Sequence, residues 1–263
     1  MFVYPEIDPI IFSIGPVAVR WYGLMYVVGF VAGWWLARRR AGLPQSPIRP
    51  EQVDDLVFYA MLGVILGGRL GYTLVYGWAE IAADPLYVLK IWKGGMSFHG
   101  GLAGVLIAMW LFGRRIGRTM WQLTDFIAPF VPIGLGAGRI GNFINGELWG
   151  KPTDVPWAFH VNGQVLHPTQ LYEALLEGLV LFVILYAYSA RPRPYMAVSG
   201  LFLLLYGIFR TFIEFFRVPD AHMGDGGYLA AGWLTTGMLL SAPMIAAGVI
   251  LLFLAYRKRE PAA

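Results

Sequence analysis

The sequence predicts an all-α, polytopic integral membrane protein with about seven transmembrane helices and a small head segment outside the membrane. Three observations lead to this prediction. Of the 263 residues, 57% are hydrophobic and only 14% are charged, whereas soluble domains carry about 25% charged residues. Apolar stretches of spanning length recur along the chain. The basic residues are distributed unevenly between the segments that connect these stretches.

Seven apolar stretches are candidates for membrane crossing, and we treat residues 1–263 as a single transmembrane domain. The third stretch is short, and the fourth is interrupted by Pro129, Pro132 and several glycines. Such breaks are tolerated within a membrane where protein or water satisfies the freed backbone groups. The stretches cover residues 18–37, 56–76, 97–113, 121–140, 169–189, 196–216 and 232–255.

The basic residues predict the orientation of these spans. Twelve of the 20 Lys and Arg residues follow spans one, three, five and seven. Only Lys90, Lys93, Lys151 and Arg217 lie in segments on the other side. The positive-inside rule places the twelve in the cytoplasm, so the N-terminus lies outside and the C-terminus in the cytoplasm. The twelve are Arg38, Arg39, Arg40, Arg49, Arg114, Arg115, Arg118, Arg191, Arg193, Arg257, Lys258 and Arg259.

Two of the outward segments have compositions typical of folded structure. Residues 78–95 combine Trp78, Tyr87 and Trp92 with two lysines, a pattern that predicts a helix lying at the membrane surface. Residues 141–167 hold tryptophans, prolines and polar residues, and they are predicted to form the small head.

Composition also excludes several kinds of function. The net charge is only +4 and the basic residues occur in short clusters, which argues against a nucleic-acid partner. The chain has no cysteine and therefore no disulfide, thiolate metal site or cysteine nucleophile. The four histidines show no metal-ligand spacing. We expect neither a metal nor another cofactor.

Arginines within the predicted spans require an explanation, because a charge near the bilayer centre costs at least about 2.5–3.5 kcal/mol. Arg139 lies in a glycine-rich segment, three residues before Asn142 and followed by Glu147. Its planar fork among glycine amides suits a phosphodiester. The alternative is a glycine helix-packing motif with an arginine that reaches to the interface.

A second polar group occupies the sixth span. Tyr206, Arg210 and Glu214 follow at four-residue intervals and form one stripe on a helix. The alternative is an ion pair that only offsets the burial of its own two charges. Because a buried pair stabilises poorly compared with apolar packing, we favour a functional role for this stripe.

Two histidines and one further arginine complete the polar inventory. His99 lies among four glycines at the outer start of span three, where it is either a general base near neutral pH or a hydrogen-bonding residue. His167 opens span five, and we favour a structural role in which His167 or Thr169 caps the helix and Glu173 supports it. Arg69 is predicted to be buried, for no reason that the sequence reveals.

These motifs together resemble the prolipoprotein diacylglyceryl transferase family. The strings are RWYGLMY, GGMSFHGG, GAGRIGNFINGELWG, HPTQLYE and YGIFRTFIEFFRVPD. The resemblance extends from about Phe12 to Arg257, with the motifs in the family's order. The stretch between Lys151 and His167 is short for the family, which leaves recognition of the acceptor by the head open.

The resemblance implies a multi-pass enzyme of the bacterial cytoplasmic (inner) membrane with a periplasmic head. Such enzymes move the diacylglyceryl group of phosphatidylglycerol onto the lipobox cysteine of a prolipoprotein and release glycerol phosphate. Arg139 and Arg210 then correspond to phosphate-contacting residues and His99 to the proposed base. Further positions of the family's motifs are Tyr22, Gly94, Asn142, Glu147, Tyr206 and Glu214. His99 and a carboxylate such as Glu214 remain alternatives for the base. A transporter, or a lipid-binding or scrambling protein without chemistry, is the competing interpretation.

Overall fold

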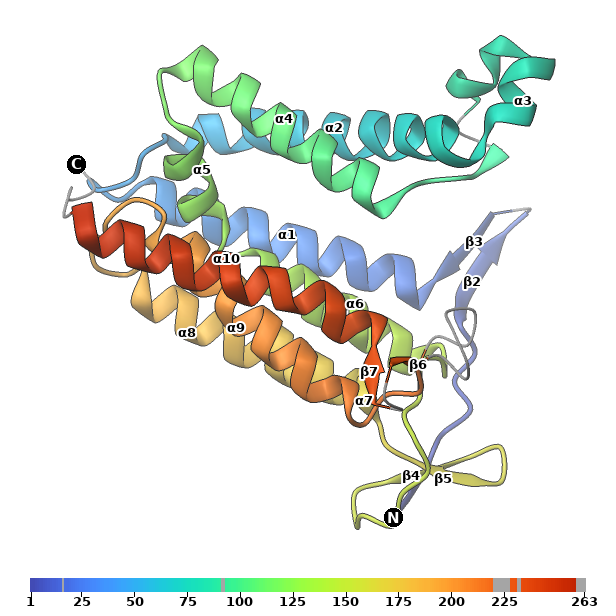
Figure 1. The fold of residues 1–263 in the computed structure, drawn as a ribbon. Helices are drawn as coiled ribbons and strands as arrows, with labels where there is room; N and C mark the ends of the chain where they lie inside the picture. Colours follow the sequence, from blue (N-terminus) through green and yellow to red (C-terminus); the bar gives the residue numbers. More distant parts are fainter. Residues whose placement is uncertain (16, 91–92, 220–227, 231–232, 259–263) are drawn as a thin grey trace. The chain divides into compact units, whose positions relative to one another are not determined.

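The computed structural model describes residues 1–15, 17–90, 93–219, 228–230 and 233–258 (Figure 1). The chain divides into two compact units, one of residues 1–36 and 124–263 (unit 1) and one of residues 37–123 (unit 2). Helices dominate both units, which confirms the mostly helical prediction. The short strands of unit 1 were not predicted from the sequence.

Unit 2 is built on two glycine-rich helices that pack closely. It begins in the last turn of α1 (Trp21–Ala41) and contains α2 (Pro50–Tyr76), α3 (Trp78–Ala83), the 3₁₀ helix η1 (Pro85–Leu89) and α4 (Phe98–Ile116). A Cβ added to Gly63 of α2 would lie 2.6 Å from the Gly104 oxygen of α4. The two backbones therefore touch, as small residues allow in membrane helices.

The predicted interfacial helix of residues 78–95 is broken into two short helices. Asp84 separates α3 from η1, accepts a hydrogen bond from the Leu86 amide at 3.1 Å and pairs with Lys90. The Lys90 ammonium lowers the pKa of Asp84. Trp92, which belongs to the predicted segment, lies outside the described residues.

Arg69 is explained by this segment. Its side chain is buried in α2, and its guanidinium lies 4.5 Å from the centre of the Tyr87 ring. It donates hydrogen bonds to four backbone carbonyl oxygens of the segment before α4, namely those of Tyr87, Val88, Gly94 and Gly95. Arg69 therefore ties the segment that ends at Gly94 and Gly95 to α2.

Unit 1 contains the remaining helices. They are α5 (Met120–Ile127, which begins in unit 2), α6 (Val131–Ile144), α7 (Thr169–Glu173), the π-helical η3 (Ala174–Val180), α8 (Leu181–Tyr188), α9 (Ala197–Glu214) and α10 (Thr236–Lys258). The helices α7, η3 and α8 form one continuous span. The hydrophobic core includes Leu181 and Leu185 of α8 and Val198 of α9. Asp125 of α5 accepts hydrogen bonds from the Met196 and Ser199 amides and so holds the start of α9.

The strands of unit 1 form three small sheets. In the first, β1 (Phe2–Val3) pairs in parallel with β4 (Phe159–Val161), which pairs antiparallel with β5 (Gln164–Leu166). The strands β2 (Ile10–Ile14) and β3 (Val17–Arg20) form a hairpin, and β6 (Tyr228–Ala230) pairs with β7 (Leu234–Thr235). The predicted head segment is thus a loop and hairpin that the N-terminal strand joins.

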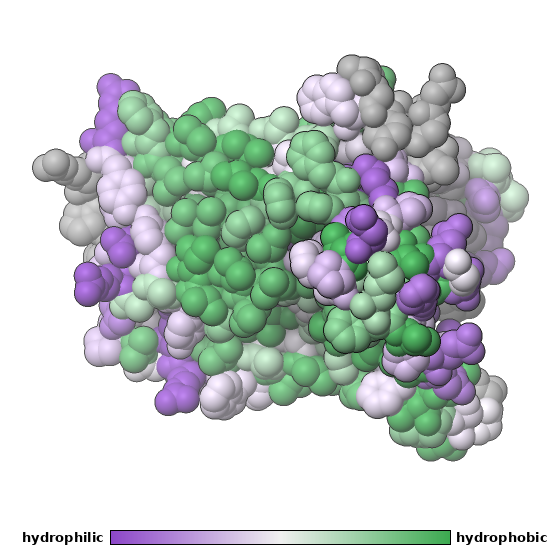
Figure 2. Space-filling model, turned by 90° about the horizontal axis from the view of Figure 1, so that it is seen from below, coloured by the Kyte–Doolittle hydropathy of each residue, from purple (hydrophilic) through white to green (hydrophobic). Residues whose placement is uncertain are grey.

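The surface of the helices is apolar, as in a membrane protein. On the face shown in Figure 2, hydrophobic residues form a broad band, and hydrophilic residues gather at its two ends. Large side chains of η3, α8, α9 and α10 are about half exposed, including Leu179, Val183, Phe212, Leu240 and Ile250. Soluble proteins rarely expose such a continuous apolar surface.

Four helical segments in the described part of the chain are long and apolar enough to cross a membrane. They are α2, the continuous span Thr169–Tyr188, α9 and most of α10. A fifth crossing results if α5 and α6, which meet at 44°, form one broken span. That bend lies at the prolines where the sequence predicted an interruption. The helices α1 and α4 coincide with the other two predicted stretches but are not among these segments, so the count of seven stays a prediction.

Candidate active site

The polar cluster of unit 1 is centred on Glu173, the last residue of α7. Its side chain is fully buried, and it forms ion pairs with three arginines. The Arg139 Nε lies 2.8 Å from Oε2, whereas Nη1 of Arg210 and Nη1 of Arg217 lie 3.4 and 2.6 Å from Oε1. The sequence predicted only a supporting role for Glu173, but the structure places it where α6, α7 and the end of α9 meet.

Glu214 is the second carboxylate of the cluster. Its Oε1 forms ion pairs with Arg210 Nη2 at 2.5 Å and with Arg217 Nε at 3.3 Å. Its Oε2 accepts a hydrogen bond from the Thr235 hydroxyl at 2.6 Å. The predicted Arg210–Glu214 pair is therefore present, but both partners also have other partners. We call Arg139, Arg210, Arg217, Glu173 and Glu214 the arginine cluster.

The arginine cluster is asymmetric in charge and in exposure. Three guanidinium groups share two carboxylates, which leaves one positive charge in excess among these five residues. Arg139 keeps 26% of its side chain exposed and Arg210 keeps 17%, whereas Glu173 is fully buried. The cluster can therefore offer N–H donors to an anion while its own carboxylates stay inside the protein.

The end of α6 continues this network. Arg139 Nη1 donates to Asn142 Oδ1 at 3.4 Å, and Asn142 Nδ2 donates to Glu147 Oε1 at 2.8 Å. Gln170 of α7 donates to the backbone oxygen of Glu147. The expectation that Arg139 and Asn142 share a helix face is confirmed. Asn142 also links Arg139 to Glu147 by hydrogen bonds.

Glycines of α6 allow its close approach to other elements. A Cβ on Gly178 of η3 would lie 2.7 Å from the Gly136 Cα, so these two backbones are in contact. A Cβ on Gly141 would lie 2.9 Å from Cδ2 of Tyr22, which packs against α6 beside Asn142. The phosphate and helix-packing interpretations of this motif are therefore compatible, because the glycines set the distances at which the polar groups meet.

Two tyrosines lie beside the network. The Tyr22 hydroxyl is 3.0 Å from that of Tyr26, one turn along α1. Tyr206 lies one turn before Arg210 on α9, and its ring stacks on that of Phe202 with centroids 5.8 Å apart. Both aromatic rings are held by packing rather than left at a free surface.

A third buried carboxyl group escaped sequence analysis. Glu177 lies in η3, one turn after Glu173, and is 1% exposed. Neither of its carboxyl oxygens has a hydrogen-bond partner in the described part of the chain. The π-helical geometry of this turn is typical of functional sites, whereas the apolar residues around Glu177 in the sequence gave no signal for it.

His167 contacts Tyr172 of α7 but does not cap this helix. Its Nδ1 lies 3.0 Å from the Tyr172 hydroxyl, which accepts from Trp157 Nε1 at 2.7 Å. Burial lowers the pKa of His167. The expectation that His167 or Thr169 caps the helix is wrong, because the cap is Pro168 without a side-chain hydrogen bond and the Thr169 hydroxyl donates to Leu148.

His99 and Gly94 belong to unit 2, whereas the arginine cluster belongs to unit 1. His99 is exposed in the first turn of α4, and its ring meets that of Phe98 edge-on at 5.6 Å. The Ser97 hydroxyl caps this helix by accepting from the Gly100 amide at 3.2 Å. Gly94 has a φ of +78°, which only glycine adopts without strain.

Comparison with known proteins shows the family to which the chain belongs. The family model for prolipoprotein diacylglyceryl transferase matches residues 9–254. The chain is 56% identical to the phosphatidylglycerol–prolipoprotein diacylglyceryl transferase of Pseudomonas savastanoi pv. phaseolicola, over 100% of this chain and 98% of that protein. It is 57% identical to the protein of the same name from Methylococcus capsulatus, over 99% and 100% of the two chains. The chain therefore belongs to the prolipoprotein diacylglyceryl transferase family.

Proposed function

We propose that this chain is a transferase that moves the sn-1,2-diacylglyceryl group of phosphatidylglycerol to the lipobox cysteine thiol of a prolipoprotein. A thioether forms and glycerol phosphate is released. The observation that carries the proposal is the arginine cluster, in which partly exposed arginines are held by buried carboxylates. The relatives that match this chain over nearly its full length carry the name of this activity.

The proposed role of Arg139 and Arg210 is to bind the phosphate of the lipid. The thiolate sulfur attacks the glycerol carbon that bears the phosphate, and the carbon–oxygen bond breaks with its electrons going to the departing phosphate. Two cations at that phosphate stabilise the charge that grows on it. Four further residues are proposed to position the lipid, namely Tyr22, Gly94, Asn142 and Glu147. Tyr206 is proposed to support Arg210.

The base is proposed to be His99 rather than Glu214. Oε2 of Glu214 already accepts a hydrogen bond, and its Oε1 forms ion pairs with two arginines. These partners favour a role of Glu214 in fixing the arginines. His99 is exposed, and histidine is the side chain that most often acts as a general base.

We further propose that residues 1–263 form one transmembrane domain of seven helices in the bacterial inner membrane. In this arrangement α1 and α4 are the two additional spans. The N-terminus, the segment 78–95 and the head 141–167 lie in the periplasm, and the C-terminus lies in the cytoplasm. The distribution of basic residues supports this orientation.

The direct test supplies phosphatidylglycerol and a lipobox peptide to the purified protein and measures thioether product and released glycerol phosphate. We expect both products in equal amounts, and none with a peptide whose cysteine is replaced by serine. Lipid binding or scrambling without either product would overturn the enzyme assignment.

His99→Asn tests the proposed base. We expect turnover to fall by about 10²–10⁴-fold, the usual contribution of general acid–base catalysis, while phosphatidylglycerol still binds. His160→Asn is the matched control, because His160 is an exposed residue of β4. Turnover at the full rate in His99→Asn would show that His99 is not an obligatory base.

A further inference from the structure

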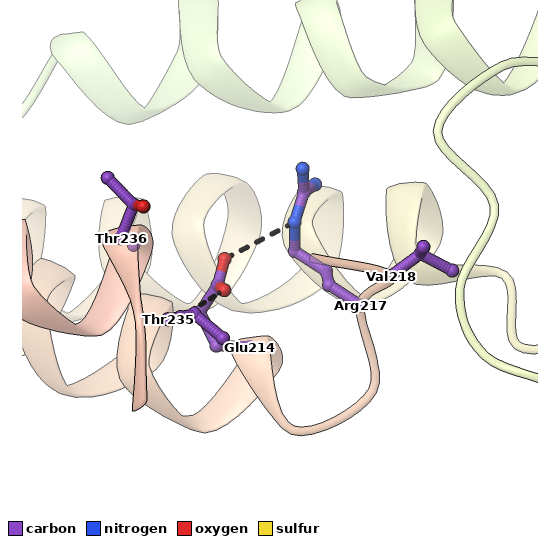
Figure 3. A pocket seen from close by; sticks show the side chains of 6 residues that line it. Glu214, Arg217, Val218, Thr235 and Thr236 are labelled. Carbon is purple, nitrogen blue, oxygen red and sulfur yellow. Dashed lines mark hydrogen bonds and ion pairs between the residues drawn. The ribbon is translucent and has the colours of Figure 1, made fainter. Parts of the chain in front are cut away.

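The turn that leads into α10 holds one side of the arginine cluster. A small open pocket with about 200 Å³ of space, its mouth included, lies between the end of α9 and the start of α10. Its lining includes Glu214, Arg217, Thr235 and Gly237. Figure 3 shows the Glu214 carboxylate between the Arg217 guanidinium and Thr235, with both interactions drawn.

The Thr235 hydroxyl is oriented by two hydrogen bonds, one that it accepts and one that it donates. The residue is 2% exposed, and its Oγ1 accepts a hydrogen bond from the Met238 amide at 3.2 Å in the first turn of α10. The single hydroxyl proton is then donated to Glu214 Oε2 at 2.6 Å. This hydrogen bond occupies Oε2, so the two arginines share Oε1.

Gly237 limits the position of the same carboxylate by its lack of a side chain. A Cβ at this position would lie 2.5 Å from Oε1 and 2.6 Å from Cδ of Glu214. Real Cβ atoms do not approach other heavy atoms so closely, so the carboxylate would have to move. Its ion pairs with Arg210 and Arg217 would then break or lengthen.

We infer that Thr235 and Gly237 are positioning residues, which set the Glu214 carboxylate and through it the direction of Arg210 and Arg217. The inference rests on the proposed function, in which these arginines face a lipid phosphate. Thr235 acts through its hydrogen bond to Glu214, and Gly237 acts by having no Cβ that would displace the carboxylate. Neither residue has to touch the substrate. A guanidinium that turns away from its working direction loses bidentate geometry with a phosphate.

The test compares Thr235→Val, Thr235→Ser and Gly237→Ala in the full-length protein. For each variant, phosphatidylglycerol affinity, turnover with a lipobox peptide and thermal unfolding are measured. We expect Thr235→Val and Gly237→Ala to lower turnover by about tenfold or more, since a hydrogen bond to a charged group is lost or displaced. Thr235→Ser keeps the hydroxyl and should restore most of the activity.

The controls separate positioning from helix stability. Thr211→Val removes a hydroxyl that donates only to the Gly207 carbonyl within α9, and Gly33→Ala adds a Cβ that meets only ordinary contacts at 3.8 Å or more. We expect both to retain activity. If Thr235 and Gly237 only stabilised α10, Gly237→Ala would be neutral or beneficial, because alanine favours helices more than glycine does.

The outcomes for the inference and for the proposed function differ. Wild-type turnover and affinity in Thr235→Val and Gly237→Ala would overturn the positioning role. Loss of activity in Thr235→Ser equal to that in Thr235→Val would overturn the role of the hydroxyl. If the wild-type protein gave no thioether, the proposed function would fail, and the affinity measurements would still decide the inference.

Discussion

At the scale of single residues, the cost of burying charge explains most of the polar contacts. Each buried arginine has several acceptors. Arg69 uses four backbone carbonyls, whereas the arginine cluster uses two carboxylates. The two solutions differ in charge, because carbonyls leave the full positive charge of the arginine and carboxylates cancel most of it. Exposure decides their roles: Arg69 is buried with its donors on the backbone and is a structural residue, whereas Arg139 and Arg210 of the arginine cluster remain partly exposed to a ligand.

Glu173→Gln tests the centre of the arginine cluster. The amide cannot neutralise the three arginines, and breaking a buried ion pair costs about 3–5 kcal/mol. We expect turnover to fall by at least about a hundredfold and the unfolding temperature to drop, measured on the purified protein. Glu80→Gln, on the exposed face of α3, is the matched control. Full activity in Glu173→Gln would contradict the central role of this carboxylate.

Arg69→Lys tests the attachment of the segment before α4. Lysine lacks the planar fork that reaches several carbonyls at once. We expect trypsin to cleave at Lys90 or Lys93 several times faster in this variant, measured by mass spectrometry of the fragments. Arg115→Lys, on the exposed end of α4, should leave the cleavage rate unchanged. An unchanged rate in Arg69→Lys would mean that other contacts hold the segment.

At the scale of elements, glycines determine how closely two helices can pack, and therefore which polar side chains meet. The pairs Gly63–Gly104 and Gly136–Gly178 bring backbones into contact. The second pair places η3 against α6, so that Glu173 of α7 reaches Arg139. Larger residues at these positions would separate the helices by more than these ion pairs tolerate.

Gly178→Ala tests this spacing. The new Cβ would lie 2.7 Å from the Gly136 Cα, and overpacking costs about 1–3 kcal/mol. We expect a lower unfolding temperature together with lower turnover. Gly134→Ala is the matched control, since a Cβ at Gly134 meets nothing within 4 Å and alanine favours the helix. A Gly178→Ala protein as stable as the control would show that α6 and η3 can separate without cost.

At the scale of the whole molecule, the apolar surface indicates a membrane protein, and the distribution of basic residues predicts its orientation. The exposed apolar side chains on η3, α8, α9 and α10 suit lipid rather than water. The basic residues lie mainly after alternate predicted spans. The exposed apolar surface fits a membrane protein, and the distribution of basic residues supports the proposed orientation.

Single cysteines test that orientation, because the natural chain has no cysteine. Gln164→Cys, in the exposed part of β5, is expected to react with a membrane-impermeant maleimide in intact cells. Gln45→Cys, in the exposed connection after α1, should react only after permeabilisation. Reaction of both positions from the same side would contradict the proposed topology.

The sequence by itself determined the mostly helical membrane character, the break between α5 and α6, and the motifs that identify the family. It also placed Arg139 with Asn142, and Arg210 with Glu214, because both pairs lie within single helices whose period is fixed. Such local relations need no knowledge of the fold.

The tertiary structure alone decided which of these groups meet. Glu173 joins Arg139 of α6, Arg210 of α9 and Arg217, which lies three residues after the end of α9. Thr235 reaches Glu214 from the end of β7, directly before α10. These residues are far apart in the chain, and their contacts depend on helix packing distances that glycines such as Gly136 and Gly178 set. Arg217 and Glu177 escaped prediction for the same reason, because burial and the direction of a side chain follow from packing rather than from neighbouring residues.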